Sequence, residues 1–162
     1  MPQIEMQHVT KYFTNEQRRF AAINDVSLSI ERGEFVFLIG SSGAGKTTLL
    51  RLLANQIVAD EGKIWLDDVE LTRMRGWRRP AYRRNIGQVW QDASLIRKKT
   101  VRQNLELVQR ALGVKSKVIP ENTRKALSIV GMRAMEDRYP FELSGGQVKM
   151  VELARAIICN PP

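Results

Sequence analysis

The chain has 162 residues, of which 43% are hydrophobic and 27% are charged. This length and balance are ordinary for one globular domain with a sizeable core, and they argue against a disordered or fibrous chain. The single cysteine, Cys159, excludes an internal disulfide. The clearest apolar run, residues 35–39, is too short to span a bilayer, and the first residues lack a signal-peptide pattern.

The net charge is +9, and much of it is local. Between residues 73 and 84 the basic side chains are Arg73, Arg75, Arg78, Arg79, Arg83 and Arg84, with Trp77 and Tyr82 among them. A solvated surface, attraction to an anionic membrane beside a membrane partner, and nucleic-acid binding are the three explanations for such a cluster. No nucleic-acid module signature accompanies it, so nucleic acid is the partner we expect least.

The first half of the chain reads mainly as short strands, because apolar and polar residues alternate there. These strands are expected over residues 4–9, 20–23, 26–30, 64–66 and 69–71. They form an antiparallel set joined by turns. The apolar run at 35–39 predicts a buried strand, and a helix that follows a glycine-rich loop is expected to reach about Gln56.

The second half of the chain reads as helical. Thr100 and Gln103 have the spacing of a capping box, and Gly113 stops the helix that they begin. Pro120 starts the next helix and Gly131 ends it. No internal repeat or low-complexity segment interrupts this pattern.

The loop after the apolar run reads Gly-Ser-Ser-Gly-Ala-Gly-Lys-Thr at residues 40–47, which is a phosphate-binding loop. Its glycines, Gly40, Gly43 and Gly45, lack the side chains that would keep backbone N–H groups away from a polyphosphate. The helix that follows adds a partial positive charge at its start. Lys46 is expected to contact the β- and γ-phosphates, and the Thr47 hydroxyl is the expected Mg²⁺ ligand.

A second motif, Leu-Ser-Gly-Gly-Gln at residues 143–147, opens another predicted helix. Ser144 and Gln147 have capping-box spacing, and Gly145 and Gly146 leave the first-turn N–H groups open to an anion. One nucleotide rarely needs two such helix starts from one chain. Two copies arranged head to tail would let the second site of one copy cover the phosphate held by the first site of the other.

Together these motifs resemble those of ATP-binding-cassette ATPases, with residues 40–47 as the Walker A loop and residues 143–147 as the LSGGQ signature. The resemblance covers the whole chain. It implies an α/β fold, namely a P-loop NTPase (RecA-like) core with an N-terminal antiparallel β subdomain and a helical insertion. It also implies ATP and Mg²⁺ as ligands and a homodimer in the nucleotide-bound state.

The resemblance assigns roles to individual residues. Gln91 follows a strand-like stretch at 86–90 and resembles the Q-loop glutamine, which touches Mg²⁺ and the attacking water. Tyr12 resembles the aromatic residue that stacks on adenine. Lys46 and Gln91 are therefore the catalytic candidates, and Thr47 and Gln91 the metal ligands. The nucleotide-binding candidates are Tyr12, Gly40, Ser41, Ser42, Gly43, Ala44, Gly45, Lys46, Thr47, Thr48, Ser144, Gly145, Gly146 and Gln147.

Within the family, the pattern around residues 62–65, 83–87 and 100–104 is most similar to the cell-division ATPases of the FtsE type. This similarity implies an FtsX-like integral membrane protein as partner and a cytoplasmic location on the inner face of the membrane. ATPases of lipoprotein or macrolide exporters and of amino-acid importers share most of the pattern and are the first alternative. A nucleic-acid-associated ABC ATPase and a non-hydrolysing nucleotide-binding module are alternatives of other classes.

The sequence departs from the family pattern in two places. Val148 and the pair Lys149-Met150 replace residues that are usually polar and Gln-Arg, respectively. Family members continue after residue 162 into the Walker B strand and a switch histidine, so we expect this chain to be a fragment that binds nucleotide better than it hydrolyses it. Self-association or a poorly ordered part of the core is expected as well.

We expect one ABC ATPase domain over 1–162, of which only the N-terminal part is present. Residues 1–91 would form the β subdomain and nucleotide core, 92–142 the helical subdomain, and 143–162 the signature motif and its helix.

Overall fold

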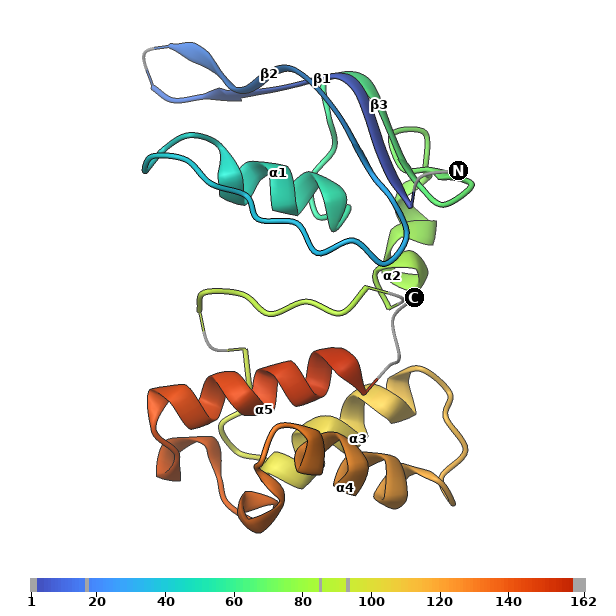
Figure 1. The fold of residues 1–162 in the computed structure, drawn as a ribbon, viewed down its shortest axis with the longest axis vertical. Coiled ribbons are helices and arrows are strands. Elements are labelled where there is room, and N and C mark those ends of the chain that lie inside the picture. Colours follow the sequence, from blue (N-terminus) through green and yellow to red (C-terminus); the bar gives the residue numbers. More distant parts are fainter. Residues whose placement is uncertain (1–2, 17, 85, 93, 159–162) are drawn as a thin grey trace. The chain divides into compact units, whose positions relative to one another are not determined.

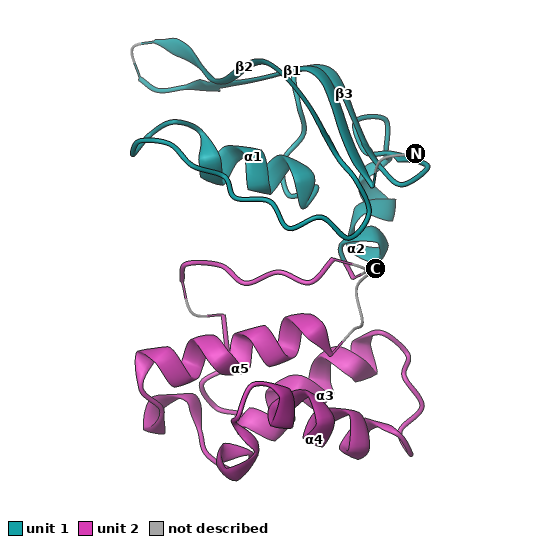
Figure 2. Cartoon of the chain, in the orientation of Figure 1, with its two compact units in different colours: residues 1–83 teal, residues 84–162 magenta. Residues whose placement is uncertain are grey.

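The computed structural model describes residues 3–16, 18–84, 86–92 and 94–158. The chain divides into two compact units, Met1–Arg83 and Arg84–Pro162, coloured teal and magenta in Figure 2. Cys159 lies outside the described residues. No helix in the described ranges is long and apolar enough to cross a membrane.

The first unit is built on a four-stranded antiparallel sheet, seen at the top of Figure 1. Its strands are β1 (Ile4–Thr14), β2 (Arg19–Ile30), β3 (Glu61–Leu66) and β4 (Val69–Glu70), and their order is β2-β1-β3-β4. The expected antiparallel set is thus confirmed. The strands predicted at 20–23 and 26–30 are one long strand, because the break at Asp25, which has φ 48°, is a local irregularity in the pairing with β1.

One helix, α1 (Lys46–Leu53), packs on this sheet. Leu49 and Leu52 of α1 are buried against side chains of β1, β2 and β3. The core of the unit consists of Met6, Val9, Ile23, Leu49, Leu52, Ile64 and Leu71. The helix ends before the predicted Gln56, because the buried Asn55 adopts a left-handed conformation with φ 50°.

The strand predicted at 35–39 is wrong for this structure. Residues 34–40 have no regular secondary structure, and the only sheet in the described part of the chain does not include them. Phe35 is 84% exposed and Ile39 is 89% exposed. A strand with two apolar faces needs neighbouring strands and covering layers, and the described residues supply no strand beside this one.

The strand-like stretch at 86–90 is also irregular in the structure. Residues 86–90 form no strand for the same reason as residues 35–39. A strand exists only when its backbone groups pair with those of a neighbouring strand. The first unit ends in a short 3-10 turn, η1 (Gly76–Arg78), which is followed by a short helix, α2 (Arg79–Arg83).

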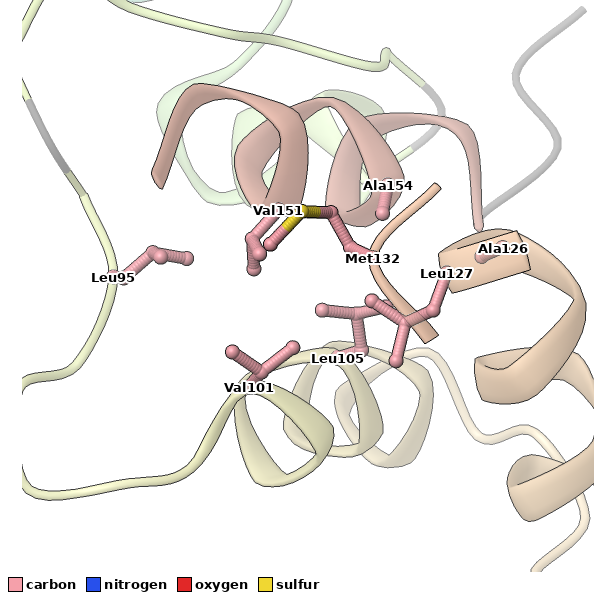
Figure 3. Packing of buried hydrophobic residues seen from close by; sticks show 8 residues of the cluster. All are labelled: Leu95, Val101, Leu105, Ala126, Leu127, Met132, Val151 and Ala154. Atoms are coloured by element: carbon pink, nitrogen blue, oxygen red, sulfur yellow. The ribbon is translucent and has the colours of Figure 1, made fainter. Parts of the chain in front are cut away.

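The second unit is helical, as predicted. Its helices are α3 (Val101–Ala111), α4 (Ile119–Ile129) and α5 (Gly145–Ile157), with the 3-10 turns η2 (Arg133–Met135) and η3 (Pro140–Glu142) between α4 and α5. Figure 3 shows their core, in which Val151 of α5 lies opposite Val101 and Leu105 of α3. Leu127 of α4 completes this cluster.

Both predicted capping boxes of the second unit are present. The Thr100 hydroxyl accepts from the Gln103 N–H at 3.2 Å, and the Gln103 side chain accepts from the Thr100 N–H at 3.1 Å. The corresponding pair at Ser144 begins α5. Sequence spacing was sufficient here because a capping box involves only neighbouring residues.

A buried amide fixes the segment that leads into α3. The Asn104 side chain accepts from the Ile96 N–H at 2.7 Å and donates to the carbonyls of Ile96, Lys99 and Thr100 at 2.9 to 3.2 Å. Asn104 itself is 2% exposed. The amide thus adds hydrogen bonds to a segment that belongs to no sheet and precedes the first turn of α3.

We expect Asn104→Ala to lower the free energy of unfolding of the helical unit by about 2 to 3 kcal/mol, because it removes the four hydrogen bonds that the buried amide makes to the main chain. Chemical denaturation followed by circular dichroism measures this loss. The matched control is Arg110→Ala on the same helix, whose exposed pair with Glu106 at 3.6 Å is worth at most about 0.5 kcal/mol. Equal stabilities of the two variants would contradict the role of Asn104.

Candidate functional site

The start of α1 is shaped by a glycine that touches β2. Gly45 has φ 85° and ψ 2°, a left-handed conformation that favours glycine. A side chain at this position would collide with the Ala22 carbonyl and approach Ile23 Cδ1 to 2.9 Å. Gly43 has a similar φ of 81°, but a Cβ there would meet no atom within 4 Å. Of the glycines in this loop, Gly45 is therefore the one required by both conformation and space.

The first turn of α1 is open to an anion. No side chain caps it, and it carries no acidic residue. The first N–H groups of a helix have no acceptor within the helix, and the helix dipole makes this end partly positive. These properties fit the phosphates of a nucleotide, and the exposed Thr47 hydroxyl at the same end fits an oxygen ligand for Mg²⁺.

Lys46 lies folded over the loop. Its Nζ donates to the Gly40 carbonyl at 2.7 Å and to the Ser41 carbonyl at 2.6 Å. The Ala44 N–H also bonds to the Ser41 carbonyl, at 3.3 Å. The ammonium group is thereby held beside the turn that the sequence assigns to phosphate. Ser41, Ser42 and Thr48 belong to the same loop and first turn.

Tyr12 lies at the same end of the sheet as this loop. It pairs with Ala21 across the β1–β2 hairpin, and the next residue, Ala22, is the one whose carbonyl lies against Gly45. The Arg19 guanidinium lies over the Tyr12 ring, 3.9 Å from its centre. Such a cation–π contact orients the ring and covers one of its faces.

Sequence reasoning missed both Arg19 and Asp60 at this position. The Asp60 carboxylate accepts from the Tyr12 N–H at 2.7 Å and pairs with Lys11 Nζ at 3.1 Å. The Tyr12 N–H, followed by Lys11, holds the pKa of Asp60 below its usual value. A hairpin register that pairs Thr14 with Arg19 would have pointed to the arginine, whereas Asp60 comes from a distant segment and left no local signal.

The remaining predicted residues lie in the second unit. Gln91 is exposed on an irregular segment. Its neighbour Trp90 is fixed through the main chain, because the Trp90 carbonyl accepts from Lys149 Nζ at 2.6 Å. Gln91 thus projects from an anchored stretch rather than from the end of a strand.

The signature motif forms a second helix start, that of α5, and this start carries a capping box between Ser144 and Gln147. The Ser144 hydroxyl accepts from the Gln147 N–H at 3.3 Å, and Gln147 Oε1 accepts from the Ser144 N–H at 2.9 Å. Gly145 and Gly146 are exposed, and a Cβ on either would meet no atom within 4 Å. Packing within the chain therefore does not require glycine at these two positions. The absence of side chains leaves space for a ligand at the N–H groups of α5.

The predicted residues therefore fall into two sets. Tyr12, the loop at 40–45 and the first turn of α1 belong to the first unit, and Gln91 and Ser144–Gln147 to the second. Among the described residues no group of three or more His, Cys, Asp or Glu could hold a metal ion by itself. The predicted metal ligands Thr47 and Gln91 come from different units.

We expect Gly45→Ala to destabilise the first unit by more than about 3 kcal/mol and to abolish binding of nucleoside triphosphate, because the new methyl group meets β2. Gly43→Ala is the matched control, since it imposes the same φ without a clash and is expected to cost about 1 kcal/mol. Denaturation curves and titration with a fluorescent nucleotide measure the two effects. Similar losses in both variants would show that conformation alone, and not the contact with β2, requires glycine.

Comparison with protein-family models places residues 23–162 in the family described as ABC transporter. The methionine import ATP-binding protein MetN 4 of Oceanobacillus iheyensis is 38% identical over 158 residues, which are 98% of this chain and 46% of that protein. The cell division ATP-binding protein FtsE of Mycobacterium tuberculosis is 36% identical over 158 residues, which are 98% of this chain and 68% of that protein. The chain thus spans less than half of the import relative and about two thirds of the division relative.

Solved structures agree with the sequence relatives. The ATP-binding cassette MJ0796, in a dimeric post-hydrolysis state bound to ADP and Pi, matches with a TM-score of 0.90 and 28% identity. The match covers 98% of this chain and 71% of that one. A second dimeric structure of the same cassette gives a TM-score of 0.90 and 29% identity. The predicted fold class, a P-loop NTPase fold, is confirmed, and the chain belongs to the ABC transporter family of ATP-binding cassettes.

Proposed function

We propose that the protein is the ATP-binding subunit of a membrane-associated ABC assembly and that it binds ATP together with Mg²⁺. The observation that carries this proposal is the uncapped start of α1, with Lys46 Nζ held 2.6 to 2.7 Å from two carbonyls of the loop before it. A fixed cation beside free N–H groups is suited to a polyphosphate rather than to a neutral ligand.

The candidate site residues have different roles in nucleotide binding. The N–H groups after Gly45 and the Lys46 ammonium bind the phosphates, and the Thr47 hydroxyl binds Mg²⁺. Neutralisation of charge on the transferred phosphoryl group is the chemistry that Mg²⁺ supplies when bound. Tyr12 offers adenine the ring face that Arg19 leaves uncovered. Gln91, from the second unit, orients the attacking water.

We propose further that two copies of the chain cooperate. Each carries one helix start without a side-chain cap after Gly45 and a second helix start, with a capping box, after Ser144. In a head-to-tail homodimer, Ser144–Gln147 of one copy would contact the phosphates held by Lys46 of the other. The solved cassettes with a TM-score of 0.90 are dimeric, which supports this arrangement. Residues 1–91, 92–142 and 143–162 would then serve as nucleotide core, partner-facing insertion and signature segment.

For the membrane partner, we propose an FtsX-like integral membrane protein in cell division, with the ATPase on the cytoplasmic face of the membrane. FtsE relatives of 35–36% identity support this choice. A role in amino-acid import is the second candidate, favoured by the 38% identity to the MetN 4 protein. Co-purification from membranes identifies the partner, whereas salt-sensitive retention on DNA would favour a nucleic-acid role instead.

We expect Lys46→Ala to weaken Mg²⁺-dependent ATP binding by about ten- to a hundredfold, since it removes a charged donor to the phosphates. Equilibrium titration with ATP measures the affinity, and release of inorganic phosphate by the full-length protein measures hydrolysis. Arg51→Ala, an exposed cation on the same helix, is the control and is expected to leave affinity unchanged. Unaltered affinity in Lys46→Ala would overturn the proposed site. Tight binding without phosphate release would indicate a non-hydrolysing module.

We expect Gly146→Ala to weaken the association of two copies without destabilising the fold of either copy. The added methyl group meets nothing within 4 Å in the chain, and alanine favours a helix over glycine by about 1 kcal/mol, so stability should hold or rise slightly. ATP-dependent dimerisation, measured by sedimentation, should fall together with turnover. Loss of turnover in a variant that still dimerises normally would contradict the head-to-tail contact.

A further inference from the structure

Helix α5 holds the main chain on both sides of Gln91. Three side chains spaced three residues apart, Lys149, Glu152 and Arg155, share one face of this helix. The Lys149 Nζ donates to the Trp90 carbonyl at 2.6 Å, and Arg155 Nη1 donates to the Ser94 carbonyl at 2.9 Å. The residue before Gln91 and the residue three positions after it are thus tied to successive turns of one helix.

Glu152 is the centre of this contact. One of its carboxylate oxygens accepts from the Ser94 N–H at 2.5 Å and from the Ser94 hydroxyl at 2.8 Å, and the other accepts from Lys149 Nζ at 2.7 Å. Arg155 also donates to the Ser94 hydroxyl. Lys149, one of the residues that depart from the family pattern, therefore links Glu152 to Trp90.

Glu152 is fully buried, with an exposed fraction of 0%. Burial raises the pKa of the Glu152 carboxyl, but the hydrogen bonds from Lys149 and Ser94 outweigh burial and hold the pKa below its usual value. The group is therefore a carboxylate at neutral pH. Burying a carboxylate costs free energy unless all of its hydrogen-bond donors are in place. The contacts of Glu152 therefore favour a single arrangement of the loop relative to α5.

The same helix begins at the signature motif. α5 runs without interruption from Gly145 to Ile157, and the Ser144–Gln147 capping box fixes its first turn. Val151 and Ala154 anchor it in the core with Leu105 and Leu127, as Figure 3 shows. A displacement of the signature end is consequently carried along the helix to the face that holds Glu152.

We propose that Glu152 is a positioning residue that fastens the Gln91 segment to the signature helix, so that Gln91 and Ser144–Gln147 move as one body. This proposal rests on the proposed ATPase function, in which both groups serve nucleotides. Glu152 touches neither nucleotide nor water in this role and acts through Ser94, Lys149 and Trp90. Contact of a second copy with the signature motif would then move Gln91 as well.

The coupling can be measured without hydrolysis. Spin labels at Asp92→Cys and Leu153→Cys, both exposed, report the distance between loop and helix in a full-length protein whose Cys159 is replaced by serine. We expect one narrow distance distribution in the parent and a broad one in Glu152→Gln, since one of the two oxygens that accept from Ser94 and from Lys149 becomes an NH2 group, which donates and cannot accept. Ser94→Ala, a milder change, is expected to broaden the distribution in part.

The rate of ATP hydrolysis tests whether this coupling affects the role proposed for Gln91. Glu152→Gln is expected to lower the ATP turnover rate about tenfold while ATP affinity stays within about twofold of the parent, because the loop geometry and not the phosphate loop is changed. In a Gln91→Ala background the same substitution should cause no further loss, as expected for a residue that acts through Gln91.

The matched control is Thr123→Val, which removes the buried hydrogen bond between Thr123 and Gln109 at 2.9 Å elsewhere in the helical unit. It should leave both the distance distribution and turnover unchanged. A narrow distribution in Glu152→Gln, or equal turnover losses in Glu152→Gln and Thr123→Val, would overturn the proposal. If the parent hydrolyses no ATP, the proposed function fails, but the distance measurement still decides whether Glu152 couples loop and helix.

Discussion

The contact between Gly45 and β2 is the constraint on which the first unit depends. It sets where α1 begins, and it leaves no room for a side chain that could cap the helix or cover its N–H groups. The positive end of the helix therefore stays open, and Lys46 folds beside it. Because Tyr12 pairs with the strand that Gly45 touches, one packing contact orients both the phosphate-binding and the base-stacking candidates.

In the second unit, buried polar side chains hold an irregular segment in place. Residues 94–100 have no sheet partner, and backbone groups of four of them bond to two buried polar side chains, Glu152 on α5 and Asn104 on α3. Such groups stabilise only when every partner is present, which makes them better at defining one geometry than at adding stability. Gln91 lies three residues before this stretch.

The starts of α1 and α5 differ in how they use glycine. Gly45 is required by conformation and by space inside the chain, whereas Gly145 and Gly146 face open space. The first glycine is explained by folding alone. At the other two, a side chain would meet no atom of the chain, so the N–H groups at the start of α5 have open space before them.

The sequence by itself determined the features that depend on neighbouring residues: both capping boxes, the helices that they begin and the antiparallel strands. It predicted strands at 35–39 and 86–90 that the structure does not form, because pairing depends on a neighbour and not on apolar content. Only the tertiary structure identified Arg19 and Asp60 at Tyr12 and Glu152 behind Gln91. These contacts join residues that are distant along the chain or on adjacent strands, and no local pattern encodes a distance in space.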